Sequence, residues 1–368
     1  MTSKYHFETP VDVETLQEVT KALNFFVGRV GVHRSDSDGF TLTAPEGIAE
    51  QDFRDAVKHF LKGKRPLRER VIADDPGKVE VSCELPSSDR IEVTSGSFLQ
   101  GPRWRAAMDS TEDRVRRSFA EQFGAIRLRV PSVISRQVLV SAGYYRKFPN
   151  LVNAISRIRN DYWDGVAVSQ LRPGQSEALA SYYVPSGDVL NPVTCYHVYS
   201  QAQQLLERYD GATLFAVEGS VFRHESYNHG PTRLAEFTMH EMVRMGPERQ
   251  AQEDFERFLE AFVRFFGDLG VPYRIVSAAD AFFGDEPTLS RGAQLLSGAK
   301  YEVRVPLGRD ELSVASVNLH GPVFADAFRL DRLGPIEATC CAGIGIDRLV
   351  YALQAYGLCA GDSVKAAL

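Results

Sequence analysis

The chain has 368 residues, of which 44% are hydrophobic and 24% charged, and its net charge is −6. This length suggests two domains, or one large domain with an appendage. The acidic balance argues against broad binding to a nucleic-acid backbone, and no apolar run is long enough to span a membrane. Five cysteines without regular spacing argue against a disulfide framework. Because the N-terminus MTSKYHFETP lacks the apolar centre of a signal peptide, we expect a cytoplasmic protein.

The first hundred residues have an α+β pattern. Apolar residues recur at helical spacing in two segments and alternate as in half-buried strands in two more. The expected helices cover 12–26 and 49–64, and the expected strands cover 78–85 and 90–96.

A third helix is predicted over residues 110–124. Ser110 is its expected N-cap, and Asp113 stands at capping-box spacing. We place a domain boundary near residue 108, ahead of this helix. It divides the chain into an N-terminal α+β domain, 1–108, which is a candidate for docking a partner, and a second domain, 109–368.

Strands dominate the second domain. A strand is expected from residue 125, with Pro131 after it and a helix-like segment beyond. Further strands are expected at 213–226, 233–246, 300–308 and 312–321, and helices at 247–270 and 344–357. Neighbouring strands are joined by short loops, which indicates a mostly antiparallel sheet flanked by helices and hence an α+β fold.

The segment VFRHESYNHGPTRLAEFTMHE, residues 221–241, combines charged and aromatic side chains in one hairpin pattern. Two antiparallel strands joined at Gly230 and Pro231 would place Arg223 and Glu225 on one face. The second strand would align Arg233, Ala235, Phe237, Met239 and Glu241. This pattern fits a solvated hairpin with cross-strand ion pairs. It also fits a site for an anionic group and a flat ring, since arginine offers a planar fork to phosphate.

The last predicted helix carries a positively charged side chain in its first turn, where this charge is unfavourable. Its apolar stripe consists of Ile346, Leu349, Val350 and Leu353. Arg348 lies off this stripe in the first turn, where a positive charge opposes the helix dipole. A bound anion such as phosphate would account for that position.

Three ordered segments resemble the signature motifs of class II aminoacyl-tRNA synthetases: Pro131, FRHE with RLAEF within 222–237, and GIGIDRL at 343–349. Other segments are similar to the amino acid:carrier protein ligases, which are shortened relatives of the zinc-dependent, methanogen-type seryl-tRNA synthetases. These segments are NPVTCYHVYSQ, SAADAFFGDE, RGAQLLSGAKYEVRVPL, SVNLHGPVF and CCAGIGIDRL. The resemblance covers roughly residues 115–360 and leaves the N-terminal hundred unexplained.

The resemblance implies a site for ATP. Arg223 would hold the α-phosphate, and Arg348 would grip the γ-phosphate. Glu225 would contact the adenine amino edge, and Phe237 would stack on the ring. Mg²⁺ would tie the phosphates together. The implied reaction is adenylation of an amino acid by in-line displacement at phosphorus, in which positioning and charge neutralisation supply the catalysis.

The resemblance also implies one zinc ion, held by Cys195, Glu241 and Cys341. Three protein ligands leave a fourth position open, which the α-amino group of the substrate would take. Cys340 stands beside Cys341, so this ligand is ambiguous by one residue, and alignment on GIDR favours Cys341. A lone buried cysteine is otherwise most often a small apolar residue.

The amino acid pocket is less well defined by the resemblance. Glu302 would lie near the substrate amine or a magnesium ion, and the alternative is an acid on the surface of a strand. Ser316 and Asn318 share a strand face and would line the pocket. Leu312 and Ala315 replace an acid and a hydroxyl of the seryl-tRNA synthetases, which places the usual second magnesium ligand in doubt.

For the acceptor of the aminoacyl group, the resemblance favours the phosphopantetheine thiol of a carrier protein. The first alternative is tRNA, because methanogen-type seryl enzymes also have an α+β N-terminal domain. The acidic composition argues against it. The second alternative is a non-catalytic paralogue. Glycine, alanine or serine would be the substrate, and class II cores usually pair through the region around Pro131, so we expect a homodimer.

Overall fold

In the computed structural model of the chain, the described residues are 3–8, 16, 19–20, 22–24, 27, 30–35, 39–61, 70–78, 89–224, 232–280, 297–308 and 310–358. Glu225, the turn at Gly230 and Pro231, and most of the strand predicted over 78–85 lie outside them. No helix among the described residues is both long enough and apolar enough to cross a membrane.

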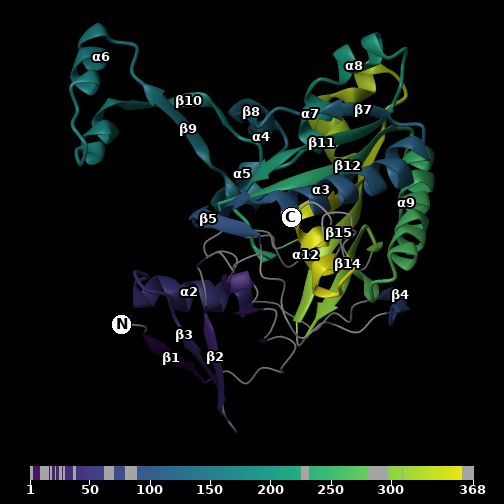
Figure 1. The fold of residues 1–368 in the computed structure, drawn as a ribbon, viewed down its shortest axis with the longest axis horizontal. Helices are drawn as coiled ribbons and strands as arrows, with labels where there is room; N and C mark the ends of the chain where they lie inside the picture. Colours follow the sequence, from purple (N-terminus) through teal and green to yellow (C-terminus); the bar gives the residue numbers. More distant parts are fainter. Residues whose placement is uncertain are drawn as a thin grey trace.

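The first residues of the chain form an N-terminal unit, 3–61, with a hydrophobic core of its own (Figure 1). It consists of a three-stranded antiparallel sheet in the order β1 (Lys4–Phe7), β3 (Gly39–Thr43) and β2 (Gly31–Ser35), with helix α2 (Glu50–Leu61). Phe53, Val57 and Phe60 of α2 are buried in this core, which confirms the helix that their spacing predicts.

The rest of the chain is built around an eight-stranded sheet. Its order is β4 (Val71–Asp75), β13 (Tyr273–Ser277), β14 (Lys300–Leu307), β15 (Asp310–Gly321), β16 (Ala338–Gly345), β12 (Glu236–Gly246), β11 (Leu214–Phe222) and β7 (Ile126–Arg129). All neighbouring strands are antiparallel except β11 and β7, which run parallel. The predicted antiparallel sheet is thereby confirmed.

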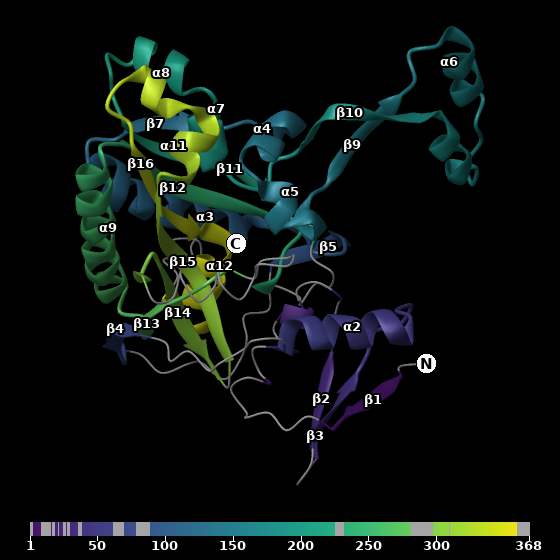
Figure 2. The same ribbon diagram turned by 180° about the vertical axis from the view of Figure 1, so that it is seen from behind.

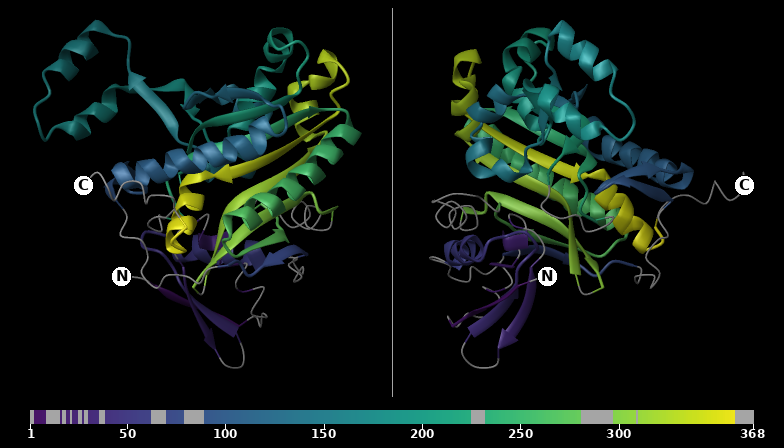
Figure 3. Two further views of the ribbon diagram at one scale, coloured as in Figure 1. Left: turned by 45° about the vertical axis from the view of Figure 1, so that its right-hand side comes forward. Right: turned by 90° about the vertical axis from the view of Figure 1, so that its left-hand side faces the viewer.

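Helices cover both faces of this sheet, and each face has its own hydrophobic core (Figure 3). On one face lie α3 (Pro102–Val115), α9 (Glu248–Leu269) and α12 (Ile346–Ala355). On the other lie α4 (Arg136–Ser141), α7 (Cys195–Ser200) and α11 (Val323–Phe328). Strand β16, between the two cores, is buried along its whole length. It was not predicted, because a strand buried on both faces lacks an alternating pattern.

The predicted start of the third helix was wrong. Helix α3 begins at Pro102, and Ser110 lies in its middle rather than at an N-cap. Its buried face starts at Trp104, six residues before Ser110, and proline is well tolerated at a helix start. Met108 therefore lies inside α3, and β4 from the first hundred residues joins the large sheet. The two-domain division at residue 108 remains a prediction.

A segment between β8 (Val133–Ser135) and α7 projects away from the sheet (Figures 1 and 2). It contains the paired strands β9 (Ala154–Ile158) and β10 (Tyr183–Leu190), with α6 (Tyr162–Ser169) and the short helix η3 (Ser176–Tyr182) at its tip. None of the residues of α6 is buried. The remaining short elements are β5 (Arg90–Thr94), β6 (Ser97–Gln100), η1 (Arg116–Glu121), α5 (Tyr144–Lys147), η2 (Pro149–Leu151), α8 (Ala202–Arg208) and η5 (Leu330–Leu333).

An ion pair between β12 and α9 allows a test of this packing. Arg244 Nε lies 2.5 Å from Asp254 Oδ2, and both side chains are buried. The variant Asp254→Ala would leave a buried guanidinium without its carboxylate, which costs about 3–5 kcal/mol of unfolding free energy. Urea denaturation measures the change. The neighbouring Glu253→Ala is the control, because Glu253 pairs with Arg249 at the surface and its loss should cost no more than about 0.5 kcal/mol.

Candidate metal and nucleotide site

The site is built on one face of the central strands. Opposed residues of paired strands have their side chains on the same face, so the strand register places them in rows. One row contains Glu302, Ser316, Gly343 and Glu241, from β14, β15, β16 and β12 in turn. The next row contains Lys300, Asn318, Cys341 and Val243. Two rows of a sheet thus bring together residues that lie up to a hundred positions apart in the chain.

Gly343 keeps the centre of the first row open. A Cβ atom added to it would lie 2.9 Å from Met239 Cε and 3.9 Å from Glu241 Oε1. A side chain at this position would therefore crowd the end of Met239 and stand in contact with the carboxylate. The absence of a side chain at this position leaves room on the face that carries Glu241.

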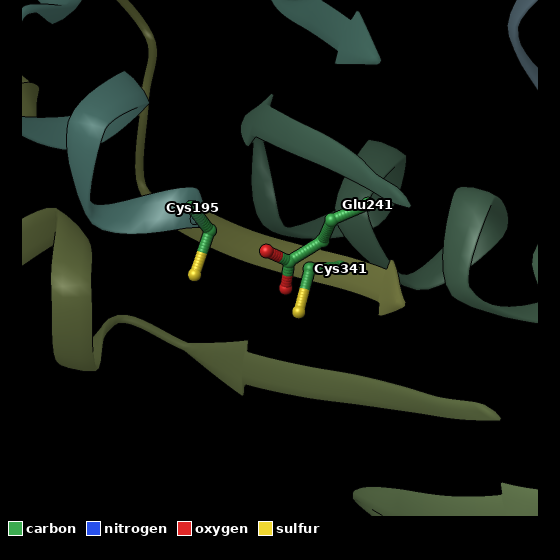
Figure 4. Close-up of side chains that lie close together, drawn as sticks. All are labelled: Cys195, Glu241 and Cys341. Carbon is green, nitrogen blue, oxygen red and sulfur yellow. The ribbon is translucent and has the colours of Figure 1, made fainter. Parts of the chain in front are cut away.

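Three potential metal ligands meet at this face (Figure 4). Cys195 begins α7, Glu241 lies in β12 and Cys341 lies in β16. Their ligand atoms all lie within 4.8 Å of one another, and all three residues are buried. Cys340 belongs to the core on the opposite face, as the alternation of side chains in a strand requires.

The chemistry of this cluster fits a metal ion. Contact with Cys195, burial and the charge of Glu241 raise the pKa of the Cys341 thiol well above its usual value. Burial likewise raises the pKa of Cys195. Both thiolates are therefore disfavoured in this cluster, and a divalent cation among the three groups would reverse this effect. Two sulfurs and one carboxylate are a donor set typical of zinc, and three protein ligands leave one position open.

Two of the candidate ligands have further polar contacts. The Thr194 hydroxyl donates a hydrogen bond to Glu241 Oε2. Asn318 Nδ2 lies 3.7 Å and His320 Nε2 lies 3.6 Å from Cys341 Sγ. Burial lowers the pKa of His320 to about 3, so its imidazole is neutral at pH 7. Of these three contacting residues the sequence predicted Asn318, as part of the amino acid pocket. Thr194 and His320 were missed, because nothing in their spacing distinguishes them.

Arg223 and Phe237 lie together at the ends of β11 and β12. The Arg223 guanidinium carbon stands 5.3 Å from the centre of the Phe237 ring, and Arg223 Nε donates to the Pro192 carbonyl over 3.3 Å. The predicted antiparallel pairing of these two strands is confirmed in part, because Val221 of β11 lies opposite Phe237 of β12. However, β11 ends at Phe222 and β12 begins at Glu236, so Arg223, Arg233 and Ala235 lie outside the strands where the sequence placed them.

Arg348 connects the last helix to both neighbouring strands. It is the third residue of α12, and the predicted stripe of Ile346, Leu349, Val350 and Leu353 is buried. Arg348 Nε donates to the Thr232 carbonyl over 2.9 Å, and its Nη1 donates to the Ser313 carbonyl over 3.2 Å. Its guanidinium is thereby held between the approach to β12 and strand β15.

Glu302 lies among cations rather than alone on a strand surface. Lys300 Nζ is 3.6 Å from Glu302 Oε1, and Arg304 Nε is 3.4 Å from Glu302 Oε2. Lys300 is buried and also pairs with Asp280, and this pairing raises its pKa against the effect of burial. A buried, charged lysine beside Asn318 is a second feature that the sequence reasoning missed.

The fold is that of the class II aminoacyl-tRNA synthetases. The M. kandleri seryl-tRNA synthetase, solved with A. aeolicus tRNASec, matches with a TM-score of 0.58 and 18% identity over 96% of this chain and 73% of that one. The Giardia lamblia prolyl-tRNA synthetase matches with a TM-score of 0.53 and 14% identity over 72% and 49% of the two chains. No family model matches the chain.

Sequence similarity identifies the family within this fold class. Amino acid--[acyl-carrier-protein] ligase 1 of Bradyrhizobium diazoefficiens is 31% identical over 234 residues, which are 62% of this chain and 71% of that protein. Ligase 2 of the same organism is 30% identical over 61% and 68% of the two chains. The type-2 serine--tRNA ligase of Methanopyrus kandleri is 30% identical over 46% and 34%. The chain belongs to the amino acid--[acyl-carrier-protein] ligase family and is a ligase.

The ligand cluster predicts which cysteine substitutions remove metal. We expect purified protein to contain stoichiometric zinc, and Cys341→Ser to lose it because one of three donors is weakened. Cys340→Ser should retain zinc, since its sulfur points into the opposite core. Elemental analysis after dialysis against a weak chelator measures both. Equal loss in the two variants would exclude a specific role for Cys341.

Proposed function

We propose that the protein activates a small amino acid with ATP to aminoacyl-AMP and transfers the aminoacyl group to the phosphopantetheine thiol of a carrier protein. The observation that carries this proposal is the convergence of Cys195, Glu241 and Cys341 on the sheet face that also carries Phe237. The two Bradyrhizobium relatives, by their names, act on acyl-carrier proteins and thereby support the acceptor.

In this proposal the nucleotide binds at the ends of β11 and β12, on the face that carries Phe237. Phe237 stacks on the adenine ring, with Arg223 close enough to reach the α-phosphate. Arg348 binds the γ-phosphate, and Glu225, which lies outside the described residues, contacts the adenine edge. Mg²⁺ neutralises the phosphate chain. These residues position the phosphate for in-line attack and stabilise its charge, which is what phosphoryl chemistry requires of a protein.

The amino acid is proposed to bind over the first two rows of the sheet. Cys195, Glu241 and Cys341 would hold zinc, which when bound supplies a Lewis acid for the α-amino group. Ser316 and Asn318 line the pocket beside it, and Gly343 leaves space for the substrate. Glu302 remains a candidate for the substrate amine or magnesium. Its pairing with Lys300 and Arg304 orients the carboxylate.

A tRNA acceptor is the alternative, and one observation favours it. The carrier-protein ligase relatives match about three fifths of the chain, whereas the likeness to the seryl-tRNA synthetase extends over 96% of it. A larger share of the chain therefore has a counterpart in the second of these matches. We retain the N-terminal domain as the proposed docking site for the acceptor, and a homodimer formed around Pro131 as the proposed assembly.

Substitution of Arg223 tests the proposed chemistry. Exchange of labelled pyrophosphate into ATP should depend on an added small amino acid. Arg223→Ala should slow it by about 10²–10³-fold, the usual cost of removing one donor to a developing charge. Arg249→Ala is the control, because its side chain is 89% exposed on α9. Exchange that is independent of amino acid, or equal in the two variants, would contradict the proposal.

The acceptor is tested separately. We expect a radiolabelled amino acid to be transferred to a phosphopantetheinylated carrier protein and not to the same carrier without its prosthetic group, since the thiol is the nucleophile. Total tRNA is assayed in parallel under the same conditions. Label on tRNA alone would replace the carrier proposal by its alternative and leave the activation step intact.

A further inference from the structure

A histidine stands at an irregular point of β15 next to the metal cluster. In the β15–β16 ladder Asn318 opposes Cys341 and Leu319 opposes Cys340, but Gly321 rather than His320 opposes Thr339. His320 is therefore the extra residue of a bulge. By the alternation of side chains His320 lies on the same face as Asn318 and Cys341. Its Nε2 reaches Cys341 Sγ at 3.6 Å.

The position of the ring is set by contacts on its other sides. His320 Nδ1 lies 3.1 Å from Thr339 Oγ1, and Thr339 is fully buried. The ring packs edge-on against Phe324, with 4.7 Å between the centroids. Tyr199 stacks on Phe324 in turn, at 5.4 Å. A histidine held at both nitrogens and on its face has little freedom to turn away from the sulfur.

When Cys341 binds a metal, the hydrogen-bond donors and acceptors of Cys341, His320 and Thr339 allow only one placement of the protons on the imidazole ring. A metal-bound thiolate accepts hydrogen bonds and donates none, so His320 Nε2 must carry the proton. Nδ1 is then the acceptor, and the Thr339 hydroxyl must donate to it. A neutral ring satisfies both contacts at once. In this arrangement a residue that does not itself bind the metal orients a metal ligand by a hydrogen bond, and the tautomer of the histidine decides which nitrogen donates it.

We propose that His320, with its tautomer set by Thr339, is a positioning residue that donates a hydrogen bond to the Cys341 thiolate and orients it for the metal. This inference rests on the metal centre of the proposed function. The hydrogen bond withdraws charge from the sulfur, so the bound ion keeps more of its own positive charge. Glu241 is held in a comparable way by the Thr194 hydroxyl.

The experiment uses the full-length protein loaded with Co²⁺, whose sulfur-to-metal charge-transfer absorption reports directly on the thiolates. We expect His320→Leu and Thr339→Val to shift this band and to weaken metal binding by about 10–100-fold in competition with a chelator. His320→Gln should have a band position and a metal affinity close to those of the wild type, because the glutamine amide nitrogen can occupy the place of Nε2. Cys340→Ala controls for disturbance of the same strand, and its band should match that of the wild type.

The outcomes separate the two proposals. If the wild type binds no metal stoichiometrically, the metal centre fails and this inference fails with it. If the wild type binds Co²⁺ but His320→Leu keeps the same band and affinity, His320 has no positioning role and the metal centre stands. If His320→Leu and His320→Gln are equally impaired, the ring acts through packing and not through its Nε2 proton, which also overturns the inference.

Discussion

Two thiols and a carboxylate are buried side by side on one sheet face, and this arrangement constrains everything around it. Burial raises the pKa of the Cys195 thiol, and contact with Cys195, burial and the charge of Glu241 raise the pKa of the Cys341 thiol. A divalent cation among the three groups would favour both thiolates and make the same proximity favourable. The neighbouring residues act in the same direction: Gly343 leaves the face open, Thr194 holds the carboxylate, and Asn318 and His320 contact the sulfur.

The fold makes this arrangement possible by burying both faces of the central strands. Helices α3, α9 and α12 close one face, so β16 can be apolar on that side and carry Cys341 on the other. Helix α7 brings Cys195 to the open face, where it packs in the second core with Val243 and Met245. A metal ligand from a helix and two from adjacent strands are therefore fixed by packing on both sides, and none depends on an exposed loop.

Two parts of the chain stand apart from this centre. The N-terminal unit has its own core, and the segment that carries β9, β10 and α6 extends away from the sheet (Figure 2). Tyr162 and Trp163 at its tip are 75% and 73% exposed. The carrier-protein ligase relative matches 62% of the chain, whereas the fold shared with the seryl-tRNA synthetase extends over 96% of it. The proposed activation site and the parts of the chain that could select the acceptor are thus spatially separate in this molecule.

Periodicity in the sequence was enough to predict α2, α9, α12 and most strands of the large sheet, because each buries one face and exposes another. The resemblance to the family was enough to select Cys195, Glu241 and Cys341 as candidate metal ligands, and the structure brings them together, although their spacing carries no such signal. Strand β16, the start of α3 and the bulge at His320 came only from the tertiary structure. A strand that is buried on both faces lacks the alternation of apolar and polar residues by which a strand is recognised. The start of a helix depends on which neighbours cover its first turn. The contact between His320 and Cys341 depends on how two strands are aligned, which local sequence does not specify.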